Sequence, residues 1–366
     1  MKYYSLTNIL KKNCRYNIIF GERSNGKTYS VLDHAVQHYF KTGKQLAVIR
    51  RWREDFRGKR GAAYFDNLVY NGEGENKIKE YSKGRYDHVA YISGKWYFST
   101  FDKDLEKNVI SSEPFAYAFA LTEMEHEKGN SYPLIDNIIF DEFMTRGMYV
   151  PDEFVLFMNT LSTIIRHRDN VTIFMCANTV DMIGCPYFKE MGLNHVAEMK
   201  QGDIELYRFN DDLTVAVEYC DEAKTTKKVK KYYAFDNPQL EMITSGKWEI
   251  ALYPHAPIRH TKYDILTRFY IIFDKKIGCG DVIKNDKYLY IFYHMHTGKH
   301  VPDENDIVYL EQHDGIINHA ILTSEIRNEK QKLIVDLMNC KREFYSDNNV
   351  GEYIRNWKIN VNRKVV

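Results

Sequence analysis

Several features that define other classes of protein are scarce in this sequence of 366 residues. Its six cysteines are scattered without a C-x-x-C pair, and its thirteen histidines show no H-E-x-x-H spacing. This argues against a zinc site or a disulfide framework and favours a reducing compartment. The amino-terminal segment lacks the apolar core of a signal peptide, and no apolar run is long enough to span a bilayer. We therefore expect a cytosolic protein with no membrane partner.

An excess of charge of either sign is also missing, because 51 basic residues face 50 acidic ones. Any nucleic-acid surface must therefore come from local clustering of charge. One cluster spans residues 224–231, and a basic stretch with interleaved aromatics spans residues 50–60. The cluster at 224–231 either contacts phosphates or is a run of solvated side chains. The stretch at 50–60 contacts nucleic-acid phosphates, lines a nucleotide pocket or is solvated. The lysines of the first cluster that we take as candidate DNA contacts are Lys227, Lys228, Lys230 and Lys231.

What the sequence does contain is a complete phosphate-binding pattern, G-x-x-x-x-G-K-[ST], at residues 21–28. The apolar run 16–20 before it suits a buried strand, and apolar residues at helical spacing follow it up to a stop at 41–43. A strand, a glycine-rich loop and a helix N-terminus together form a cradle for phosphates. We expect Lys27 to reach the β- and γ-phosphates of ATP and Thr28 to bind Mg²⁺. The predicted nucleotide-binding residues are Gly21, Arg23, Ser24, Asn25, Gly26, Lys27 and Thr28.

Further apolar runs predict the other strands of a mostly parallel sheet, at 46–49, 138–140 and 172–176. Strands that alternate with helices indicate an α/β domain. Residues 86–100 alternate around Ser93-Gly94 and predict a hairpin, and residues 152–163 predict a helix with an apolar stripe. The composition changes after about residue 205. We therefore expect a first domain at 1–205, a linker region at 206–240 and a smaller domain at 241–366.

Two acidic residues follow the run 138–140, where ligands bind in open α/β sheets. We expect Asp141 to hold the Mg²⁺ shell and Glu142 to polarise the attacking water as general base. A helix N-cap with first-turn charge is the structural alternative. Asn178, directly after another strand, is a candidate γ-phosphate sensor or else a turn residue. Arg166, in an Arg-His-Arg triplet, is a candidate for the cation that phosphoryl transfer needs, although surface arginines are usually solvated or salt-bridged.

With these motifs in place, the sequence resembles the DNA-packaging ATPases of small tailed phages, the phi29-like encapsidation protein family. The resemblance rests on an ordered set of stretches within residues 15–190, about half of the chain. The phosphate loop alone is not specific to this family, whereas the set with Glu-Lys-x-Asn-x-Tyr-Pro is. The stretches are 18–23 into 26–28, 48–51, 127–133, 139–143, 149–151, 166–168 and 177–178 through 186–188.

The resemblance implies a P-loop ATPase domain of the ASCE class, followed by a smaller α+β domain similar to an RNase H-like nuclease that has lost its catalytic acids. It implies a homo-oligomeric ring, a pentamer, that uses ATP and Mg²⁺ to move double-stranded DNA into a procapsid. The implied partners are the DNA, the portal and, in at least some members, a structural packaging RNA. The implied location is the host cytoplasm, transiently at the portal vertex.

In such a ring, Arg166 matches the finger that reaches into the neighbouring subunit's nucleotide, and Lys128 matches a second basic residue at that interface. Arg23 lies where the family also carries an arginine in the loop. The C-terminal domain would bind nucleic acid or the portal. Two alternatives stay open at this point: a terminase-type motor with a live nuclease domain, and a nucleotide-gated nucleic-acid-binding protein without motor activity.

Overall fold

The computed structural model describes residues 4–23, 25–70, 74–102, 106–127, 129–145, 149–178, 185–193, 195–210, 213–221, 253–256, 260–284, 288–312, 314–321 and 325–363. The contacts between Cα atoms divide the chain into two units, Met1–Glu249 and Ile250–Val366. Within the described residues, no helix combines the length and apolarity needed to cross a bilayer.

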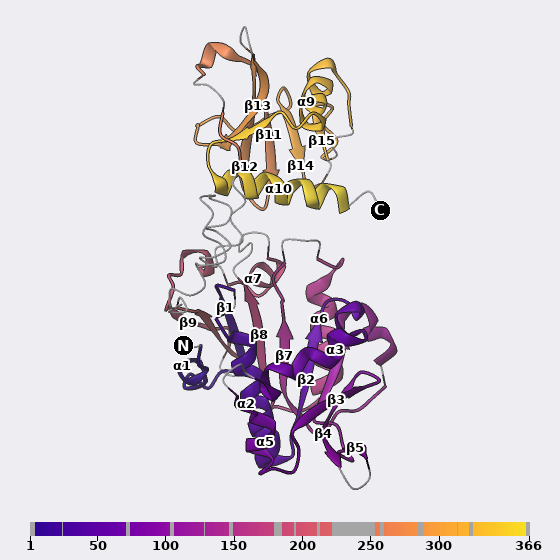
Figure 1. Ribbon diagram of the computed structural model, residues 1–366. Coiled ribbons are helices and arrows are strands. Elements are labelled where there is room, and N and C mark those ends of the chain that lie inside the picture. Colours follow the sequence, from indigo (N-terminus) through magenta and orange to yellow (C-terminus); the bar gives the residue numbers. More distant parts are fainter. Residues whose placement is uncertain are drawn as a thin grey trace. The chain divides into compact units, whose positions relative to one another are not determined.

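The first unit is built on a ten-stranded sheet with helices on both faces (Figure 1). Its strand order is β3-β4-β6-β2-β7-β8-β1-β10-β9, and β5 pairs with β4. The strands from β6 to β10 in this order pair in parallel, while β3, β4, β5 and β9 join antiparallel. The strands are β1 (Tyr16–Gly21), β2 (Gln45–Arg50), β3 (His88–Ile92), β4 (Lys95–Asp102), β5 (Lys107–Ile110), β6 (Ala116–Ala120), β7 (Ile135–Asp141), β8 (Thr172–Asn178), β9 (Ile204–Arg208) and β10 (Thr214–Tyr219).

The central strands are apolar throughout because helices cover them on both sides. One cluster of buried side chains packs the sheet against α2 and the short helices near it, and the other packs it against α6 and α7. The helices of this unit are α1 (Thr7–Leu10), α2 (Lys27–Thr42), η1 (Arg53–Phe56), α3 (Lys59–Ala62), η2 (Ala63–Phe65), α4 (Asp66–Val69), α5 (Lys77–Tyr81), η3 (Leu121–Glu127), α6 (Glu153–Ile165), α7 (Pro186–Glu190) and η4 (Val196–Glu198).

The predicted α/β class, the central strands, the hairpin and the α6 helix are confirmed by these elements. The structure corrects the predicted end of the first domain at residue 205. Strands β9 and β10 belong to the first sheet, and β10 pairs in parallel with β1. The physical reason is burial, since Val215, Ala216 and Val217 are at most 1% exposed. The remaining part of the predicted linker, from residue 222, lies outside the described residues.

The second unit contains a six-stranded sheet in the order β15-β14-β11-β12-β13-β16. Strands β11, β12 and β13 pair antiparallel, and β14 and β15 run parallel to β11. This is the strand arrangement of an RNase H-like fold. Two helices pack on one face through side chains such as Ile334 and Trp357. The elements are η6 (Lys262–Asp264), β11 (Ile265–Phe273), β12 (Lys276–Lys284), β13 (Leu289–Met295), β14 (Ile307–Leu310), β15 (His319–Ala320), α9 (Glu329–Asn339), β16 (Glu343–Tyr345) and α10 (Asn348–Arg363).

Candidate nucleotide-binding site

The loop between β1 and α2 carries the predicted phosphate-binding sequence, at the carboxyl edge of the parallel strands. Gly26 has a φ of 94°, a left-handed conformation that favours glycine, and the chain turns there into α2. Gly21 lies so close to Cys220, the residue after β10, that an added Cβ would be 2.9 Å from the Cβ of Cys220. Both glycines are therefore needed for the loop to lead the N-terminus of α2 into this edge, where anions bind.

Lys27 is buried, and four oxygen atoms surround its ammonium group. Its Nζ donates to the carbonyl oxygens of Gly21 (3.1 Å) and Glu22 (2.6 Å). It also donates to the Oδ1 atoms of Asn25 (3.1 Å) and Asn178 (3.4 Å). The proximity of Asn178 follows from the sheet, because Gly21 pairs with Asn178 across β1 and β8. The loop thus holds a cation that a triphosphate can share, with the predicted sensor amide beside it.

The hydroxyl of Thr28 and the carboxylate of Asp141 meet directly at this edge. Thr28 Oγ1 donates to Asp141 Oδ1 at 2.8 Å, and the hydroxyl of Tyr64 donates to Asp141 Oδ2 at 3.1 Å. Asp141 is 6% exposed, so its charge is largely shielded from water. A hydroxyl and a carboxylate oxygen are ligands that Mg²⁺ prefers, and the donor set therefore fits this ion.

Glu142 and Arg50 form the outer part of the site. Arg50 Nη2 lies 2.9 Å from Glu142 Oε2 and 3.4 Å from Asp141 Oδ2. The side chain of Glu142 is 64% exposed, whereas that of Arg50 is 16% exposed. Burial would lower the pKa of Arg50, but Asp141, Tyr64 and Glu142 raise it. Arg50 Nε is buried and has no hydrogen-bond partner within the described residues.

A second arginine supports the site from behind. Arg51 donates to both carboxylate oxygens of Glu153 at 2.7 and 2.8 Å, and to the carbonyl of Phe143 at 2.8 Å. Tyr187 donates its hydroxyl to Glu153 Oε1 at 2.7 Å. These contacts fix the chain directly after Glu142, which has a φ of 59°. Sequence reasoning left this network unassigned because its members are far apart along the chain.

Arg166 lies at the opposite edge of the same sheet. Its guanidinium donates to the carbonyl of Asn130 at 2.5 Å, and Arg168 donates to the carbonyl of Ile135, the first residue of β7. Asp141 is the last residue of β7, so the two edges are about 20 Å apart at ~3.3 Å per residue. The structure therefore does not bring Arg166 to the phosphate loop of its own chain.

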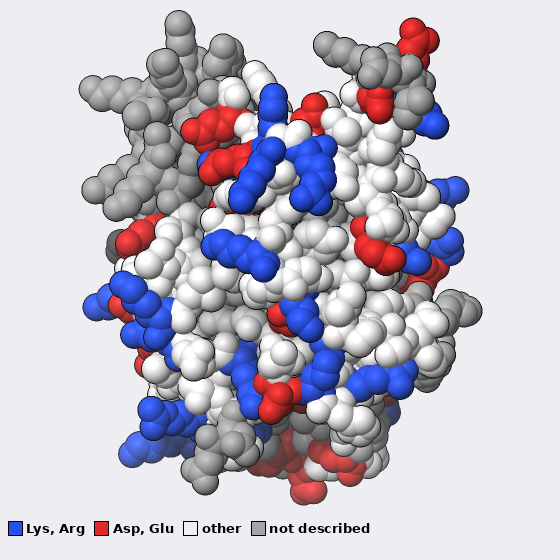
Figure 2. Space-filling view, turned by 90° about the horizontal axis from the view of Figure 1, so that it is seen from below, with Lys and Arg blue, Asp and Glu red and all other residues white. Residues whose placement is uncertain are grey.

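The remaining predicted site residues are placed only in part. Arg23 is exposed in the phosphate loop. Ser24, Lys128 and the four lysines of 227–231 lie outside the described residues. The bottom of the first unit in Figure 1 is the edge that carries Arg166, and Figure 2 shows lysine and arginine side chains spread over this face with acidic ones between them. Its basic residues include exposed Arg15 before β1 and Arg208 at the end of β9.

In the second unit, the buried acid Asp281 forms an ion pair with Arg268. Asp281 accepts hydrogen bonds from Arg268 at 2.6 and 2.8 Å and is 3.3 Å from His294 Nε2. Burial alone would raise the pKa of Asp281, but these hydrogen bonds lower it. Within the described residues, no group of three or more histidine, cysteine, aspartate or glutamate side chains is placed to hold a metal ion.

The family model for the podovirus DNA encapsidation protein (Gp16) matches residues 1–235. The chain belongs to this family. It is 27% identical over 180 residues to a DNA packaging protein of Bacillus phage B103, and 24% identical over 189 residues to that of Bacillus phage phi29. These matches cover 48% and 51% of this chain and 48% and 49% of the relatives. The chain thus spans about half the length of the curated relatives it matches.

Two solved structures are similar over nearly the whole chain. The bacteriophage Phi-29 viral genome packaging motor assembly matches with a TM-score of 0.55 and 18% identity, covering 97% of this chain and 99% of that one. The Phi-28 gp11 DNA packaging motor matches with a TM-score of 0.51 and 16% identity, covering 98% of each chain. At this identity the likeness shows the fold. The predicted resemblance to the phi29-like encapsidation family is confirmed.

Proposed function

We propose that this protein is the ATP-hydrolysing subunit of a ring-shaped motor that moves double-stranded DNA into a phage procapsid. The observation that carries the proposal is the convergence of Lys27, Thr28, Asp141 and Glu142 at one edge of the sheet. Membership in the encapsidation family supplies the process in which this chemistry is used. The work is done in the host cytoplasm and at the portal vertex.

The residues of the site suit hydrolysis of a bound triphosphate. The loop amides and Lys27 would hold the β- and γ-phosphates, and Thr28 with Asp141 would hold Mg²⁺. The ion, when bound, neutralises charge that develops on the transferred phosphoryl group. Glu142 would orient the attacking water and take its proton, and Asn178 would contact the γ-phosphate. Arg50 sets the position of the Glu142 carboxylate in the structure described here.

The position of Arg166 supports a finger that acts on the neighbouring subunit. At about 20 Å from its own phosphate loop, it can complete a nucleotide site only from another copy. Lys128 would join it at the same interface. Hydrolysis then depends on how two subunits are placed, which couples the nucleotide state to subunit position. This is the requirement for directed movement in a ring, for which we propose five subunits.

The DNA grip should be independent of sequence, because a packaging motor must pass every sequence. Lysine and arginine contacts to phosphates provide such a grip. Lys227, Lys228, Lys230 and Lys231 remain our candidates for part of it. The portal, and a structural RNA where one is used, would be further partners, with the second unit contributing to their binding.

Mixing two inactive variants tests the motor site. Arg166→Ala and Glu142→Gln subunits should each bind ATP and hydrolyse little of it when assembled alone. Mixed rings should recover part of the hydrolysis rate, because the intact Arg166 of a Glu142→Gln subunit can complete the site of an Arg166→Ala neighbour. Mixed rings without recovery, under conditions where both variants co-assemble, would refute the finger in trans.

The terminase-type alternative requires an active nuclease in the second unit, and the pairing of Asp281 with Arg268 does not favour it. Incubation of the purified protein with Mn²⁺ and plasmid DNA compares the two functions. We expect intact plasmid. Nicking that disappears when Asp281 is replaced by asparagine would support the nuclease instead.

A further inference from the structure

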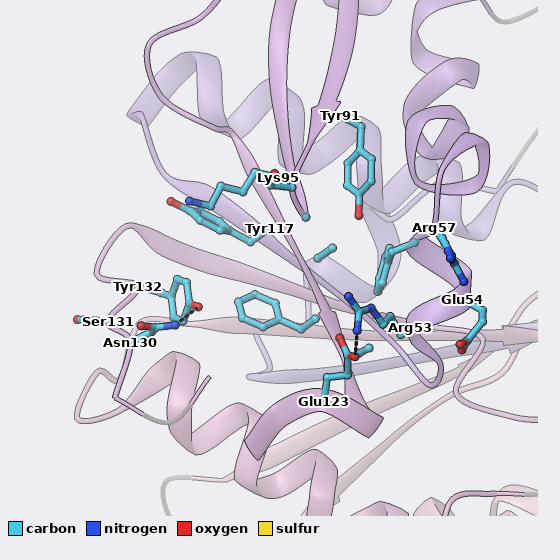
Figure 3. A pocket seen from close by; sticks show the side chains of 16 residues that line it. Arg53, Glu54, Arg57, Tyr91, Lys95, Tyr117, Glu123, Asn130, Ser131 and Tyr132 are labelled. Atoms are coloured by element: carbon cyan, nitrogen blue, oxygen red, sulfur yellow. Dashed lines mark hydrogen bonds and ion pairs between the residues drawn. The ribbon is translucent and has the colours of Figure 1, made fainter. Parts of the chain in front are cut away.

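A surface trough of about 1050 Å³ lies at the β4 end of the first sheet (Figure 3). It is lined by η1 with Arg57, the turn between β3 and β4, strand β6, Glu123 of η3 and residues 130–132. Asn130, in this lining, is the residue whose carbonyl accepts the hydrogen bond from Arg166. The trough therefore borders the arginine proposed to act on a neighbouring subunit.

The trough is polar and aromatic, with charges of both signs. Arg53, one of its three basic residues, is paired with Glu123 at 2.6 Å. Within the described residues, the guanidinium of Arg57 has no hydrogen-bond or ion-pair partner. The ammonium of Lys95 lies 5.8 Å from the centre of the Tyr117 ring. In Figure 3, the Tyr91 ring and Lys95 lie on different sides of the hollow, with Arg53 between Tyr91 and Glu123.

This composition is that of a protein-binding surface. Tyrosine and arginine are enriched in protein interfaces, where charges of both signs are common at the rim. Glu54 and Glu123 in the lining would repel the phosphates of a nucleic acid. The unpaired Arg57 and the exposed Lys95 leave an excess of positive charge. An acidic protein surface therefore fits the trough better than a nucleic acid does.

Such a surface exists at the other end of the same sheet. We name the acidic corner by its four carboxylates, Glu198, Asp203, Glu205 and Asp221. Burial raises the pKa of Tyr207, and the nearby carboxylates of Glu205 and Glu198 raise it further. Asp221 lies close to Gly202, because a Cβ added to Gly202 would be 2.7 Å from Asp221 Oδ1. The side chain of Glu198 is 79% exposed.

The acidic corner also adjoins the phosphate loop. Gln201 Nε2 donates to Glu22 Oε1 at 3.4 Å, and Glu22 lies between Gly21 and Arg23. The corner and the trough cannot meet within one chain, because six strand steps of ~4.8 Å separate β6 from β9, about 29 Å. Two such surfaces at opposite ends of a subunit can pair only between copies, head to tail, which closes a ring or extends a filament.

We propose that the trough of one copy receives the acidic corner of the next, an inference that rests on the proposed function. This single contact then places Arg166 of one copy beside the phosphate loop of the next. The trough brings Arg166 with it, and the corner brings the phosphate loop with it. The partner of this surface is thus a second copy of the chain, and its contact places the finger at the neighbour's nucleotide.

Charge reversal tests the contact in the full chain. A trough variant carries Arg57→Glu and Lys95→Glu, and a corner variant carries Glu198→Lys and Asp221→Lys. Each should self-associate only at about tenfold higher concentration than the unmodified protein, by sedimentation velocity with a non-hydrolysable ATP analogue. The combined fourfold variant should recover association, and an equimolar mixture of the two double variants should recover it in part, because two alternating variants leave one mismatched contact in a ring of five. Lys11→Glu with Lys41→Glu, at exposed positions that belong to neither set of residues, is the matched control and should associate normally.

Three results would overturn the contact. In the first, the fourfold variant is folded but self-associates no better than the two double variants. In the second, the trough variant assembles normally but loses DNA or RNA binding. In the third, the unmodified chain never self-associates. The second would assign the trough to nucleic acid. Because sedimentation does not depend on hydrolysis, failure here differs from failure of the motor site, which would leave association intact and hydrolysis unaffected by Arg166→Ala.

Discussion

Two adjacent arginines, Arg50 at the end of β2 and Arg51 directly after it, contact different acids of the site. Arg50 contacts Asp141 and Glu142, whereas Arg51 binds Glu153. Neighbouring residues of an extended chain point to opposite sides, which separates the two guanidinium groups. The sequence left this stretch open between a nucleotide pocket, nucleic-acid contacts and a solvated run, because its partners lie 91 and 102 residues away. Sequence alone could predict the loop and the acid pair, which are local patterns, but not this support.

At this scale Lys27 provides the first prediction. Lys27→Ala should reduce the rate of ATP hydrolysis about 10²-fold or more, because it removes the buried cation that stabilises charge on the phosphates. Steady-state phosphate release measures the effect. Lys41→Ala, in the exposed last turn of the same helix, is the control and should retain the rate. Normal hydrolysis by Lys27→Ala would mean that the loop does not bind the reacting nucleotide.

At the scale of elements, the structure shows which parts of the fold a sequence reveals. Strand β1 and helix α2 were predictable because glycines and apolar spacing define them locally. Strands β9 and β10 and helix α10 were not predicted. Strand β10 follows a long excursion of the chain and is buried by pairing with β1, a contact between distant residues. Tertiary pairing, rather than local propensity, determines these elements.

The buried ion pair between Arg51, the residue after β2, and Glu153 of α6 leads to a prediction about stability. Glu153→Gln should lower the free energy of unfolding of the first unit by about 3–5 kcal/mol, because it leaves the charge of Arg51 buried without its partner. Denaturant unfolding followed by fluorescence measures the loss. Glu123→Gln removes the partner of the exposed Arg53 and should cost less than about 1 kcal/mol. Equal losses for the two variants would contradict the role given to burial.

For the whole molecule, the two units have separate hydrophobic cores. The buried clusters of the first unit lie within residues 6–220, and those of the second lie within residues 269–361. Each unit therefore has its own source of cooperative stability, and its unfolding can respond to a different solution condition. Two conditions, pH and nucleotide, distinguish the units.

Above pH 6.5, His294 gives the second unit a pH response. The hydrogen bond to Asp281 raises the pKa of His294 above 6.5, against the effect of burial. A raised histidine pKa contributes stability that is complete below pH 6.5 and is lost as the pH rises through the folded value. Asp281, whose pKa is lowered, stays ionised throughout this range. The free energy of unfolding should therefore fall as the pH rises above about 6.5, by at most about 1.4 kcal/mol per pH unit, and His294→Gln should remove this decrease.

The nucleotide response belongs to the first unit, because every described residue of the candidate site lies there. A ligand that binds only the folded state stabilises it by RT ln(1 + [L]/Kd), about 2.7 kcal/mol at a concentration of 100 Kd. Calorimetry with Mg²⁺ and a non-hydrolysable ATP analogue should therefore shift one transition upward and leave the pH-sensitive one in place. Lys27→Ala should lose most of the shift, whereas Glu142→Gln should keep it, because Glu142 acts on water rather than on the bound phosphates. A shift of both transitions by the same amount would mean that the two units unfold as one body, and a shift of the pH-sensitive transition alone would place the nucleotide in the second unit.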